Sequence, residues 1–259
     1  MKHISSRDNP LVKHARALAH SSRERKKSGI ALIEGAHLVT AMHERGMVPQ
    51  TLIASETGME RDEIRKLMAG AAESHVVLSD ALFRELSTME TPAGIVALIQ
   101  PSEANPVAAD AAFCLVLEDI QDPGNVGALL RSAAAAGVKD VLMSRTCAFA
   151  WAPKVLRAGQ GAHFQLNIVE GVDLPAWVKA FRGVSLALTP VGTQSLFAVP
   201  IDGPVAVLVG NEGAGLSPAL LAAASQRVRL PMPGGFESLN AAAAGAIALF
   251  EIVRRRHPG

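Results

Sequence analysis

Three segments in the second half of the sequence combine glycine or proline with polar side chains, and each follows a short apolar run. They are residues 118–131 (EDIQDPGNVGALLR), 208–217 (LVGNEGAGLS) and 230–240 (LPMPGGFESLN). Glycine and proline allow tight turns and a close approach of backbone groups to a ligand. Apolar runs of this length are typical of buried parallel strands, and ligands bind beyond the carboxyl ends of such strands. The sequence therefore predicts a ligand site built from three loops.

Familiar small-molecule motifs do not fit these loops. Gly210, Gly213 and Gly215 are spaced GxxGxG, whereas a dinucleotide site requires GxGxxG and an acidic residue about 20 positions further on. The chain also has neither a GxxxxGK[ST] phosphate loop nor a GxSxG nucleophile elbow. A nicotinamide-dependent oxidoreductase is therefore poorly supported.

The cysteines and the apolar stretches limit the class of protein further. Cys114 and Cys147 form no CxxC or Cys/His motif, so we expect two buried thiols in a reducing compartment and no metal. The first residues are polar and basic, unlike a signal peptide. The longest apolar stretch, residues 241–250, is too short to span a bilayer. We expect a cytoplasmic protein that does not contact a membrane.

Short apolar runs alternate with helical patterns along the chain, which is typical of an α/β fold. In the first part we predict strands at residues 30–33, 51–54, 76–78 and 95–99, and helices at 7–25, 35–45, 61–69 and 80–86. In the second part we predict strands at residues 113–117, 138–143, 164–169, 184–188, 205–209 and 227–230, and helices at 125–136, 153–158, 174–181, 218–224 and 238–255. Residues 101–111 contain two prolines and no periodicity, so we expect a linker between domain 1–100 and domain 112–259.

The order and spacing of the three loop segments resemble those of the SpoU/TrmH branch of the SPOUT RNA methyltransferases. The matching residues are Asn125-Val-Gly with Arg131 and Gly137, then Gly210-Asn-Glu212-Gly with Leu216, then Leu230-Pro-Met followed by Ser238-Leu-Asn240. Together they cover residues 112–255 and are far more specific than any one of them. More weakly, residues 4–39, with Asn9-Pro10 and Ile33-Glu34-Gly35, look like the substrate-binding domain that such enzymes often carry.

The resemblance implies a parallel-sheet α/β catalytic domain whose C-terminal segment forms a deep trefoil knot. Knots are essentially absent from proteins in general, so this expectation depends on the resemblance alone. It also implies a smaller N-terminal α/β domain, similar to a ribosomal protein, that binds the RNA substrate. The implied reaction is transfer of a methyl group from S-adenosylmethionine to a ribose 2′-hydroxyl. Gly210, Leu230 and Leu239 would bind the cofactor, with Thr189 as a fourth neighbour.

The resemblance further implies catalytic roles for Asn125, Arg131, Glu212, Ser238 and Asn240. A guanidinium stays protonated and is a poor base, so we interpret Arg131 as a phosphate ligand that stabilises the developing alkoxide. The proton would then leave to water, to phosphate or to Glu212. For Glu212 we favour a role as an anchor for its loop over a direct role in the reaction. The Asn and Ser residues suit caps or turns at helix starts.

Two features beside these motifs receive no catalytic role. Glu118, Asp119 and Asp122 form an acidic cluster that we interpret as a solvated loop. Phe236 and Glu237 precede Ser238 and depart from the usual family pattern. They place a carboxylate beside the cofactor loop, and the sequence assigns it no role.

RNA is the expected partner, and ribosomal RNA is favoured over transfer RNA because a separate N-terminal domain is present. Residues 1–30 hold eight Lys or Arg against two Asp or Glu, which suits contact with phosphates and equally suits a solvated helix face. The alternatives are a transfer-RNA 2′-O-methyltransferase and a non-catalytic RNA-binding protein of the same fold.

The terminal helix predicts a homodimer. Leu239, Ala243, Ile247 and Phe250 lie on one apolar stripe, and further apolar residues widen it. A helix that covers one face of a sheet needs only one apolar stripe, so the additional apolar residues suit contact with a second protomer. The alternative is a helix buried wholly in its own domain. The resemblance favours the dimer, since such enzymes complete each site across the interface.

Overall fold

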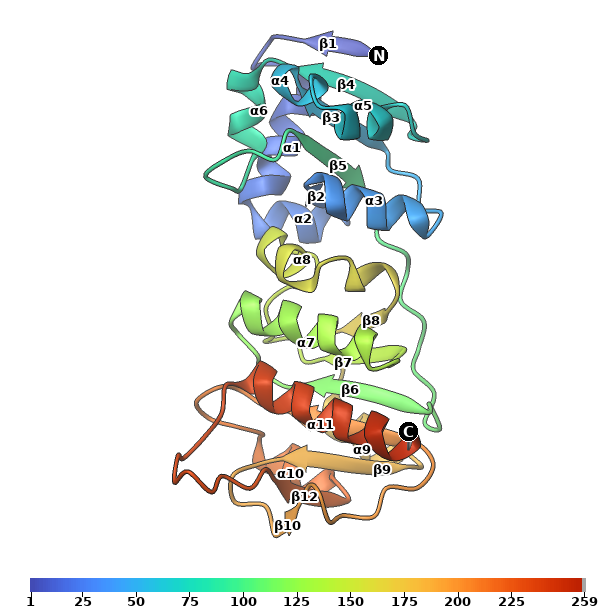
Figure 1. Ribbon diagram of the computed structural model, residues 1–259, viewed down its shortest axis with the longest axis vertical. Coiled ribbons are helices and arrows are strands. Elements are labelled where there is room, and N and C mark those ends of the chain that lie inside the picture. Colours follow the sequence, from blue (N-terminus) through green and yellow to red (C-terminus); the bar gives the residue numbers. More distant parts are fainter. Residues whose placement is uncertain (258–259) are drawn as a thin grey trace. The chain divides into compact units, whose positions relative to one another are not determined.

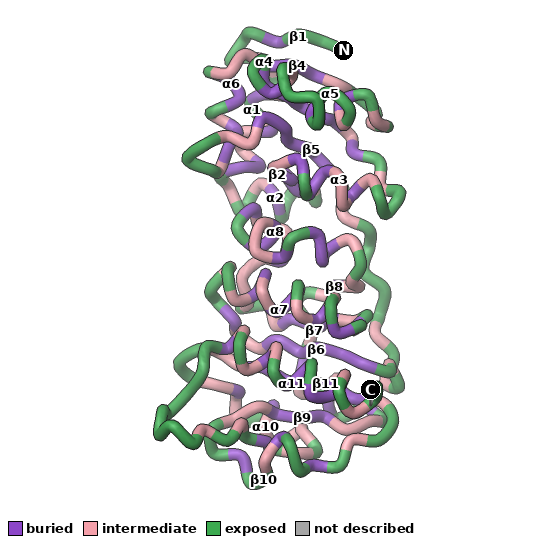
Figure 2. Tube along the Cα trace, in the orientation of Figure 1, coloured by how far each residue is buried: buried purple, intermediate pink, exposed green. Residues whose placement is uncertain are grey.

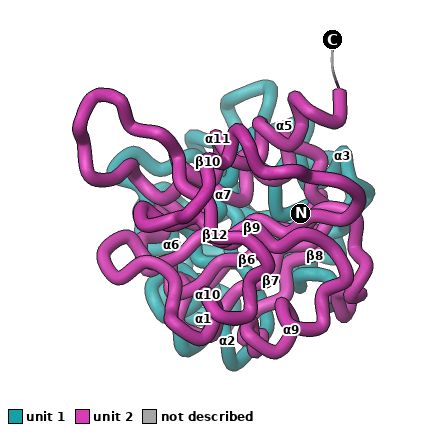
Figure 3. The backbone as a smooth tube through the Cα atoms, turned by 90° about the horizontal axis from the view of Figure 1, so that it is seen from below, with its two compact units in different colours: residues 1–103, 151–164 teal, residues 104–150, 165–259 magenta. Residues whose placement is uncertain are grey.

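The computed structural model describes residues 1–257, which form two compact units (Figure 1). The first unit is Met1–Glu103 together with Trp151–Phe164. The second unit is Ala104–Ala150 together with the described chain from Gln165 onward (Figure 3). The chain therefore passes from one unit to the other more than once.

The first unit contains a mixed sheet with the strand order β1-β4-β3-β5-β2. Its strands are β1 (Lys2–Ile4), β2 (Ala31–Glu34), β3 (Thr51–Ser55), β4 (Ser74–Leu78) and β5 (Ile95–Ile99). Its helices are α1 (Pro10–His20), α2 (Ser22–Ser28), α3 (Ala36–Glu44), α4 (Glu56–Met59), α5 (Asp62–Met68), α6 (Asp80–Leu86) and α8 (Pro153–Gly159), followed by the 3₁₀ turn η1 (Ala162–Phe164). Strands β1, β4 and β3 pair in parallel, whereas β5 is antiparallel to both β3 and β2.

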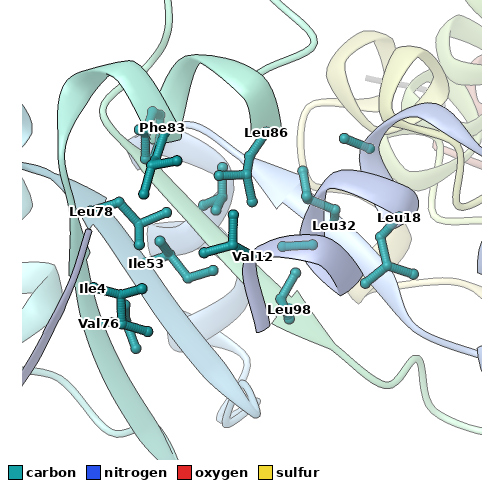
Figure 4. Packing of buried hydrophobic residues seen from close by; sticks show 14 residues of the cluster. Ile4, Val12, Leu18, Leu32, Ile53, Val76, Leu78, Phe83, Leu86 and Leu98 are labelled. Carbon is teal, nitrogen blue, oxygen red and sulfur yellow. The ribbon is translucent and has the colours of Figure 1, made fainter. Parts of the chain in front are cut away.

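Both faces of this sheet are buried, which explains its uninterrupted apolar strands. On one face, Leu32 and Ile53 pack with residues of α1 and α6, including Leu18 and Phe83 (Figure 4). On the other face, the alternate strand residues, such as Ile33, pack with α3, α5 and α8. The alternation of side chains along each strand thus supplies two cores.

Helix α8 covers β2 in the first unit, although strands of the second unit flank it in sequence. Leu156 belongs to the core on that face, and Trp151 and Phe164 pack at its edge. The Arg157 guanidinium also donates a hydrogen bond to the Thr88 hydroxyl. The sequence predicted this helix but not the sheet that it covers.

The helix predicted at residues 7–25 is divided into α1 and α2 by Ser21. The Ser21 backbone is extended, and its hydroxyl caps α2 by accepting from the Glu24 N–H. Arg25 is buried, and its guanidinium donates to the carbonyls of Leu18 and Ala19 at the end of α1. Burial lowers the pKa of Arg25. Arg25 is therefore a helix-terminus ligand and does not belong to a phosphate-binding surface.

The second unit contains a seven-stranded sheet with the order β10-β12-β9-β11-β6-β7-β8. Its strands are β6 (Phe113–Leu117), β7 (Asp140–Met143), β8 (Asn167–Glu170), β9 (Val184–Leu188), β10 (Gln194–Ser195), β11 (Val205–Val209) and β12 (Gln226–Arg229). Its helices are α7 (Pro123–Ala135), α9 (Leu174–Ala180), α10 (Pro218–Ala223) and α11 (Ala241–Arg256). Every pairing in this sheet is parallel, as the sequence predicted.

Helices cover both faces of the second sheet. α9 and α10 pack against Cys114, Val116, Ala206 and Leu208 of the central strands. α7 and α11 lie side by side on the opposite face (Figure 1). A Cβ atom on Gly245 of α11 would lie 2.3 Å from Leu129 Cδ2. This close approach explains why a small residue occupies the middle of α11.

Helices α7 and α11 begin at different residues from those predicted. α7 begins at Pro123 because the Asp122 carboxylate caps it by accepting from the Asn125 N–H at 2.8 Å. α11 begins at Ala241, and Asn240 is its cap. Neither of these helices, nor any other within residues 1–257, is long and apolar enough to cross a membrane.

Candidate active site

A pocket of about 410 Å³ lies in the second unit at the carboxyl ends of β9, β11 and β12. All four residues predicted to bind the cofactor line it, together with two of the predicted catalytic residues: Thr189, Gly210, Leu230 and Leu239, with Glu212 and Ser238. The structure thus brings together residues that are up to 50 positions apart in sequence. The wall is mostly apolar side chain and exposed backbone, which suits an uncharged, flat ligand group.

Gly210 occupies a position that only glycine fits. A Cβ atom there would lie 2.4 Å from the carbonyl carbon of Gly215 and 2.4 Å from the Leu216 nitrogen. The loop reverses direction at once, because Asn211 and Gly215 form an isolated bridge and Gly215 has a φ of 71°. The glycines therefore set the shape of this wall through close backbone packing and one left-handed residue.

Side chains tie this loop to the segment that follows β6. The Asn211 side chain accepts from the N–H groups of Gly213 and Ala214, and it donates to the Asp119 carbonyl at 2.8 Å. The Glu118 carboxylate accepts from the backbone N–H and the hydroxyl of Ser217, at 2.6 and 2.7 Å. The interpretation of Glu118 as a solvated loop residue is therefore wrong, because its carboxylate clamps the second loop to the first.

Three predicted catalytic residues form one hydrogen-bonded chain. Asn240 donates through Nδ2 to Asn125 Oδ1 at 2.9 Å, and Asn125 donates through Nδ2 to Glu212 Oε1 at 2.8 Å. Asn240 also caps α11 by accepting from the N–H groups of Ala242 and Ala243. Asn125 is not the cap of α7, since Asp122 is the cap. The side-chain amide of Asn125 is therefore available to bond Glu212 and Asn240. One amide thus joins the three loop segments.

Ser238 and Leu239 lie in the loop between β12 and α11, which is exposed from residue 233 to residue 240 (Figure 2). Phe236 and Glu237 lie in the same loop and are exposed as well. Both Ser238 and Leu239 nevertheless line the pocket. This loop therefore forms the open side of the site.

Three predicted site residues, Asn125, Arg131 and Asn240, do not line the pocket. Asn125 and Asn240 are joined by hydrogen bonds to Glu212, which does line it, whereas Arg131 has no such link. It is exposed on α7, six positions after Asn125, and so points about 120° away from Asn125 around the helix. Among residues 1–257 its side chain has neither a hydrogen bond nor an ion pair. Its guanidinium is available for a partner outside this chain.

The segment that follows Thr189 was not predicted to belong to the site. Pro190 and Val191 also line the pocket. A Cβ atom on Gly192 would lie 2.5 Å from the carbonyl carbon of Val228, so this segment packs directly on β12. This segment could have been predicted, because it is a fourth loop with proline and glycine that directly follows a predicted strand.

The described residues hold no group of three or more His, Cys, Asp or Glu arranged to bind a metal. Desolvation raises the pKa of the Cys114 thiol to about 12, and it raises the pKa of Cys147 as well. Both thiols are therefore protonated near neutral pH, and neither is a reactive nucleophile.

Comparisons with known proteins agree with this geometry. A profile of the SpoU rRNA Methylase family matches residues 112–250, and one described as the MRM3-like substrate binding domain matches residues 9–97. The chain is 34% identical to the Bacillus subtilis 23S rRNA (guanosine(2553)-2'-O)-methyltransferase RlmP, over 97% of this chain and 99% of that protein. It is 30% identical to the Streptomyces viridochromogenes 23S rRNA (uridine(2479)-2'-O)-methyltransferase, over 100% of this chain and 94% of that protein. The crystal structure of the SpoU methyltransferase AviRb from S. viridochromogenes, in complex with AdoMet, superimposes with a TM-score of 0.86 at 28% identity, covering 96% of this chain and 98% of that one.

Proposed function

Because this chain belongs to the SpoU rRNA methylase family, we propose that it transfers a methyl group from S-adenosylmethionine to a ribose 2′-hydroxyl of ribosomal RNA. The observation that carries the proposal is the pocket in which Thr189, Gly210, Leu230 and Leu239 converge. The two relatives named above act on a guanosine and a uridine at the same ribose oxygen. The shared chemistry is therefore that of the ribose, and the base differs between relatives.

The pocket suits the cofactor. Leucine and valine side chains offer apolar contact to an adenosyl group, and the Gly210 segment leaves no room for a side chain of its own. Loops packed this closely expose backbone N–H and C=O groups for hydrogen bonding with a ligand. When bound there, S-adenosylmethionine supplies a methyl group on a positively charged sulfur. Thr189, Gly210, Leu230 and Leu239 would hold it.

The chain's own contribution to the reaction is to hold the ribose and to manage one proton. Holding the hydroxyl in line with the methyl group supplies much of the rate enhancement. Arg131 binds the RNA phosphate and stabilises the alkoxide as it forms. The proton passes to water, to phosphate or to Glu212. Asn125 occupies one oxygen of Glu212 and leaves the carboxylate exposed for either an orienting or an accepting role.

A homodimer would bring Arg131 of the partner subunit to the pocket. Ala243, Ile247 and Phe250 form an exposed apolar stripe on α11, with Ile247 40% and Phe250 47% exposed. The opposite side of the helix, including Gly245 and Leu249, is buried within the unit. An exposed stripe of this kind supports an interface between two copies. The isolation of Arg131 from its own pocket supports the same assembly.

Further features of the proposal follow from the family. We place the knot in the segment from β12 to α11, whose residues line the pocket together with the 210–215 loop. We assign RNA binding to the first unit, as a domain similar to a ribosomal protein. We favour a cytoplasmic, metal-free enzyme that modifies ribosomal RNA rather than transfer RNA.

Calorimetry and RNA mapping test the proposal. The protein should bind S-adenosylhomocysteine in the presence of EDTA and should not bind NAD. With labelled cofactor, it should methylate deproteinised 23S rRNA at a site that then resists alkaline hydrolysis. Binding without transfer to any RNA would favour the non-catalytic alternative. Preferred transfer to transfer RNA would overturn the assignment of the substrate.

A further inference from the structure

A second pocket, of about 220 Å³, lies wholly within the first unit. It opens where the chain leaves β3 and β4 and where it enters β5. Its polar lining consists of Ser55, Thr57, Arg61, Asp80 and Arg84. Phe83 closes its floor and is itself part of the core (Figure 4). The pocket is thus a polar recess on a fixed apolar base.

Close backbone packing gives this pocket rigid walls. A Cβ atom on Gly58 would lie 2.4 Å from the Gly94 carbonyl oxygen, so the segments before α5 and before β5 touch. The Ser55 hydroxyl accepts from the Gly58 N–H at 2.9 Å, and the Ser55 N–H donates to the Gly94 carbonyl at 3.1 Å. Gly94 has a φ of 82°, which favours glycine. The recess is therefore built into the fold.

One wall of the pocket carries a fixed hydrogen-bond acceptor. The Asp80 carboxylate accepts from both the backbone N–H and the hydroxyl of Thr57. The hydrogen bond from the Thr57 hydroxyl is the main cause that lowers the pKa of Asp80, so the group stays ionised near neutral pH. An ionised carboxylate only accepts hydrogen bonds. A ligand that lies against it must present N–H or O–H donors.

The rim carries two guanidinium groups that the protein itself does not use. Other arginines of the first unit form ion pairs, namely Arg7 and Arg16 with Glu85, and Arg65 with Asp62. Arg61 and Arg84 are exposed, and their side chains take part in no ion pair or hydrogen bond among the described residues. Asp80 acts on Arg84 only through its charge. Two free guanidinium groups at the mouth of a recess suit an oxygen-rich anion such as a phosphate.

We propose that this pocket binds a single unpaired nucleotide of the RNA substrate, with its phosphate on Arg61 and Arg84 and its base or ribose donors toward Asp80. The inference rests on the proposed function, since it names where the first unit holds the RNA. The volume is below the roughly 300–1,000 Å³ of pockets for drug-sized ligands, so it suits one unit of a polymer. RNA offers such units in loops and bulges, where bases are splayed out.

The positive rim and the negative wall together select against simpler ligands. Inorganic phosphate would satisfy the arginines but would have its own charge repelled by Asp80. A base or nucleoside without phosphate would leave both guanidinium groups unused. A nucleotide presents an anion and a donor edge together, which matches both walls. A free mononucleotide shares this chemistry, so the experiment must separate it from RNA.

The test compares three arginine variants that change charge equally. R61A and R84A each remove one proposed phosphate ligand, whereas R65A removes an arginine of the same helix region that does not line the pocket. The probes are a fluorescein-labelled RNA hairpin with one bulged guanosine, the fully paired hairpin, 5′-GMP and inorganic phosphate. Fluorescence anisotropy gives the RNA Kd, and calorimetry gives binding of the small probes and of S-adenosylhomocysteine. Circular dichroism checks that each variant is folded.

We expect R61A and R84A each to raise the Kd for the bulged hairpin by about tenfold, the loss typical of a charged hydrogen bond. R65A should stay within about twofold, as for an exposed ion pair. The preference of the wild-type protein for the bulged over the paired hairpin should shrink in R61A and R84A. Equal weakening by all three variants, or by none, would overturn the pocket. Binding of 5′-GMP as tight as that of the bulged hairpin would overturn RNA as the ligand. The affinity for S-adenosylhomocysteine should be the same in the wild type and in all three variants. If the wild-type protein does not bind S-adenosylhomocysteine at all, the proposed function is refuted, but the pocket is not.

Discussion

The two pockets are built by the same device but have opposite chemistry. In each unit a glycine after a buried strand packs against backbone atoms at a second glycine: Gly58 against Gly94 of another loop, and Gly210 against Gly215 of its own loop. The second-unit pocket is lined mainly by apolar side chains and backbone. The first-unit pocket has a carboxylate wall and two guanidinium groups at its rim. Backbone packing therefore fixes where a pocket lies, and the side chains around it decide what it binds.

The same contrast appears in how buried carboxylates are satisfied. Glu34 of the first unit is buried and accepts from the hydroxyls of Ser87 and Thr88 and from the Thr88 N–H. Glu251 of the second unit is buried and pairs with Arg254 and Arg255. Arg255 also donates to the Leu196 carbonyl, so this ion pair connects α11 to the segment that contains β10. The buried carboxylate of the first unit thus has neutral partners, and that of the second unit has charged partners.

The largest effect should come from Arg131, whose loss should slow methyl transfer without weakening cofactor binding. Arg131→Ala should lower the rate of methyl transfer by roughly 10²–10³, as expected when a charge-stabilising donor is lost. The affinity for S-adenosylhomocysteine should stay within a few-fold, because Arg131 does not line the cofactor pocket. Single-turnover rates with labelled cofactor, together with the Kd for S-adenosylhomocysteine, measure the two. Lys139→Ala, which removes an exposed charge at the amino end of β7, is the control. If the mutant loses cofactor binding as well as transfer, the assigned role of Arg131 is wrong.

Gly210→Ala should damage the second-unit pocket alone. The added methyl group would meet backbone atoms at 2.4 Å, so we expect a loss of roughly 1–3 kcal/mol in stability and a clear loss of cofactor binding. Gly213→Ala is a matched control in the same loop, since its Cβ would meet nothing closer than 3.6 Å. Denaturant unfolding and calorimetry with S-adenosylhomocysteine report both effects. Equal behaviour of the two variants would contradict the argument from backbone packing.

Two substitutions at Glu212 distinguish a loop anchor from a proton acceptor. We favour the anchor, so Glu212→Gln, which keeps an oxygen for the Asn125 amide, should retain activity within a few-fold. Glu212→Ala removes that hydrogen bond and should cost about 1 kcal/mol in loop stabilisation, or roughly a fivefold loss of activity. The pH profile of the transfer rate is the deciding measurement. A large loss in Glu212→Gln with a flattened acidic limb would make Glu212 the base.

The smallest effect concerns the ion pair of α11. Hydrogen bonding to Arg254, and then to Arg255, lowers the pKa of Glu251 from 4.5 to about 2. A carboxyl whose pKa is lower in the folded state adds stability above its unfolded pKa, and that stability is lost as pH falls from about 4.5 toward 2. Glu251→Gln should therefore lower the Tm at pH 7 by roughly 2–4 °C, and the difference from wild type should shrink at low pH. Asp202→Asn, which changes charge by the same amount at an exposed position, is the control variant.

The sequence predicted the second sheet well because its central strands are short apolar runs buried on both faces. The family was predictable because its residues occur in three loops in a fixed order. β1 and β10 escaped prediction, since strands of three and two residues show no periodicity. The role of Asn125 was ambiguous for a chemical reason, because Asp122 and Asn125 are both good cap residues and only geometry shows which one caps. The clamp formed by Glu118 depends on a contact 99 positions away, which no local pattern encodes.

The position of α8 has a consequence for how the protein is made. Because Leu156 and its neighbours belong to the core of the first unit, that unit is incomplete when residue 103 leaves the ribosome. About 60 more residues must be synthesised before α8 can cover β2, a delay of several seconds at about 5–20 residues per second. During that interval an apolar face around Ile33 is open to chaperones or to misfolding. For the same reason, exchanging the first unit between relatives requires residues 151–164 to move with residues 1–103, so recombination at a single junction would leave one core unfilled.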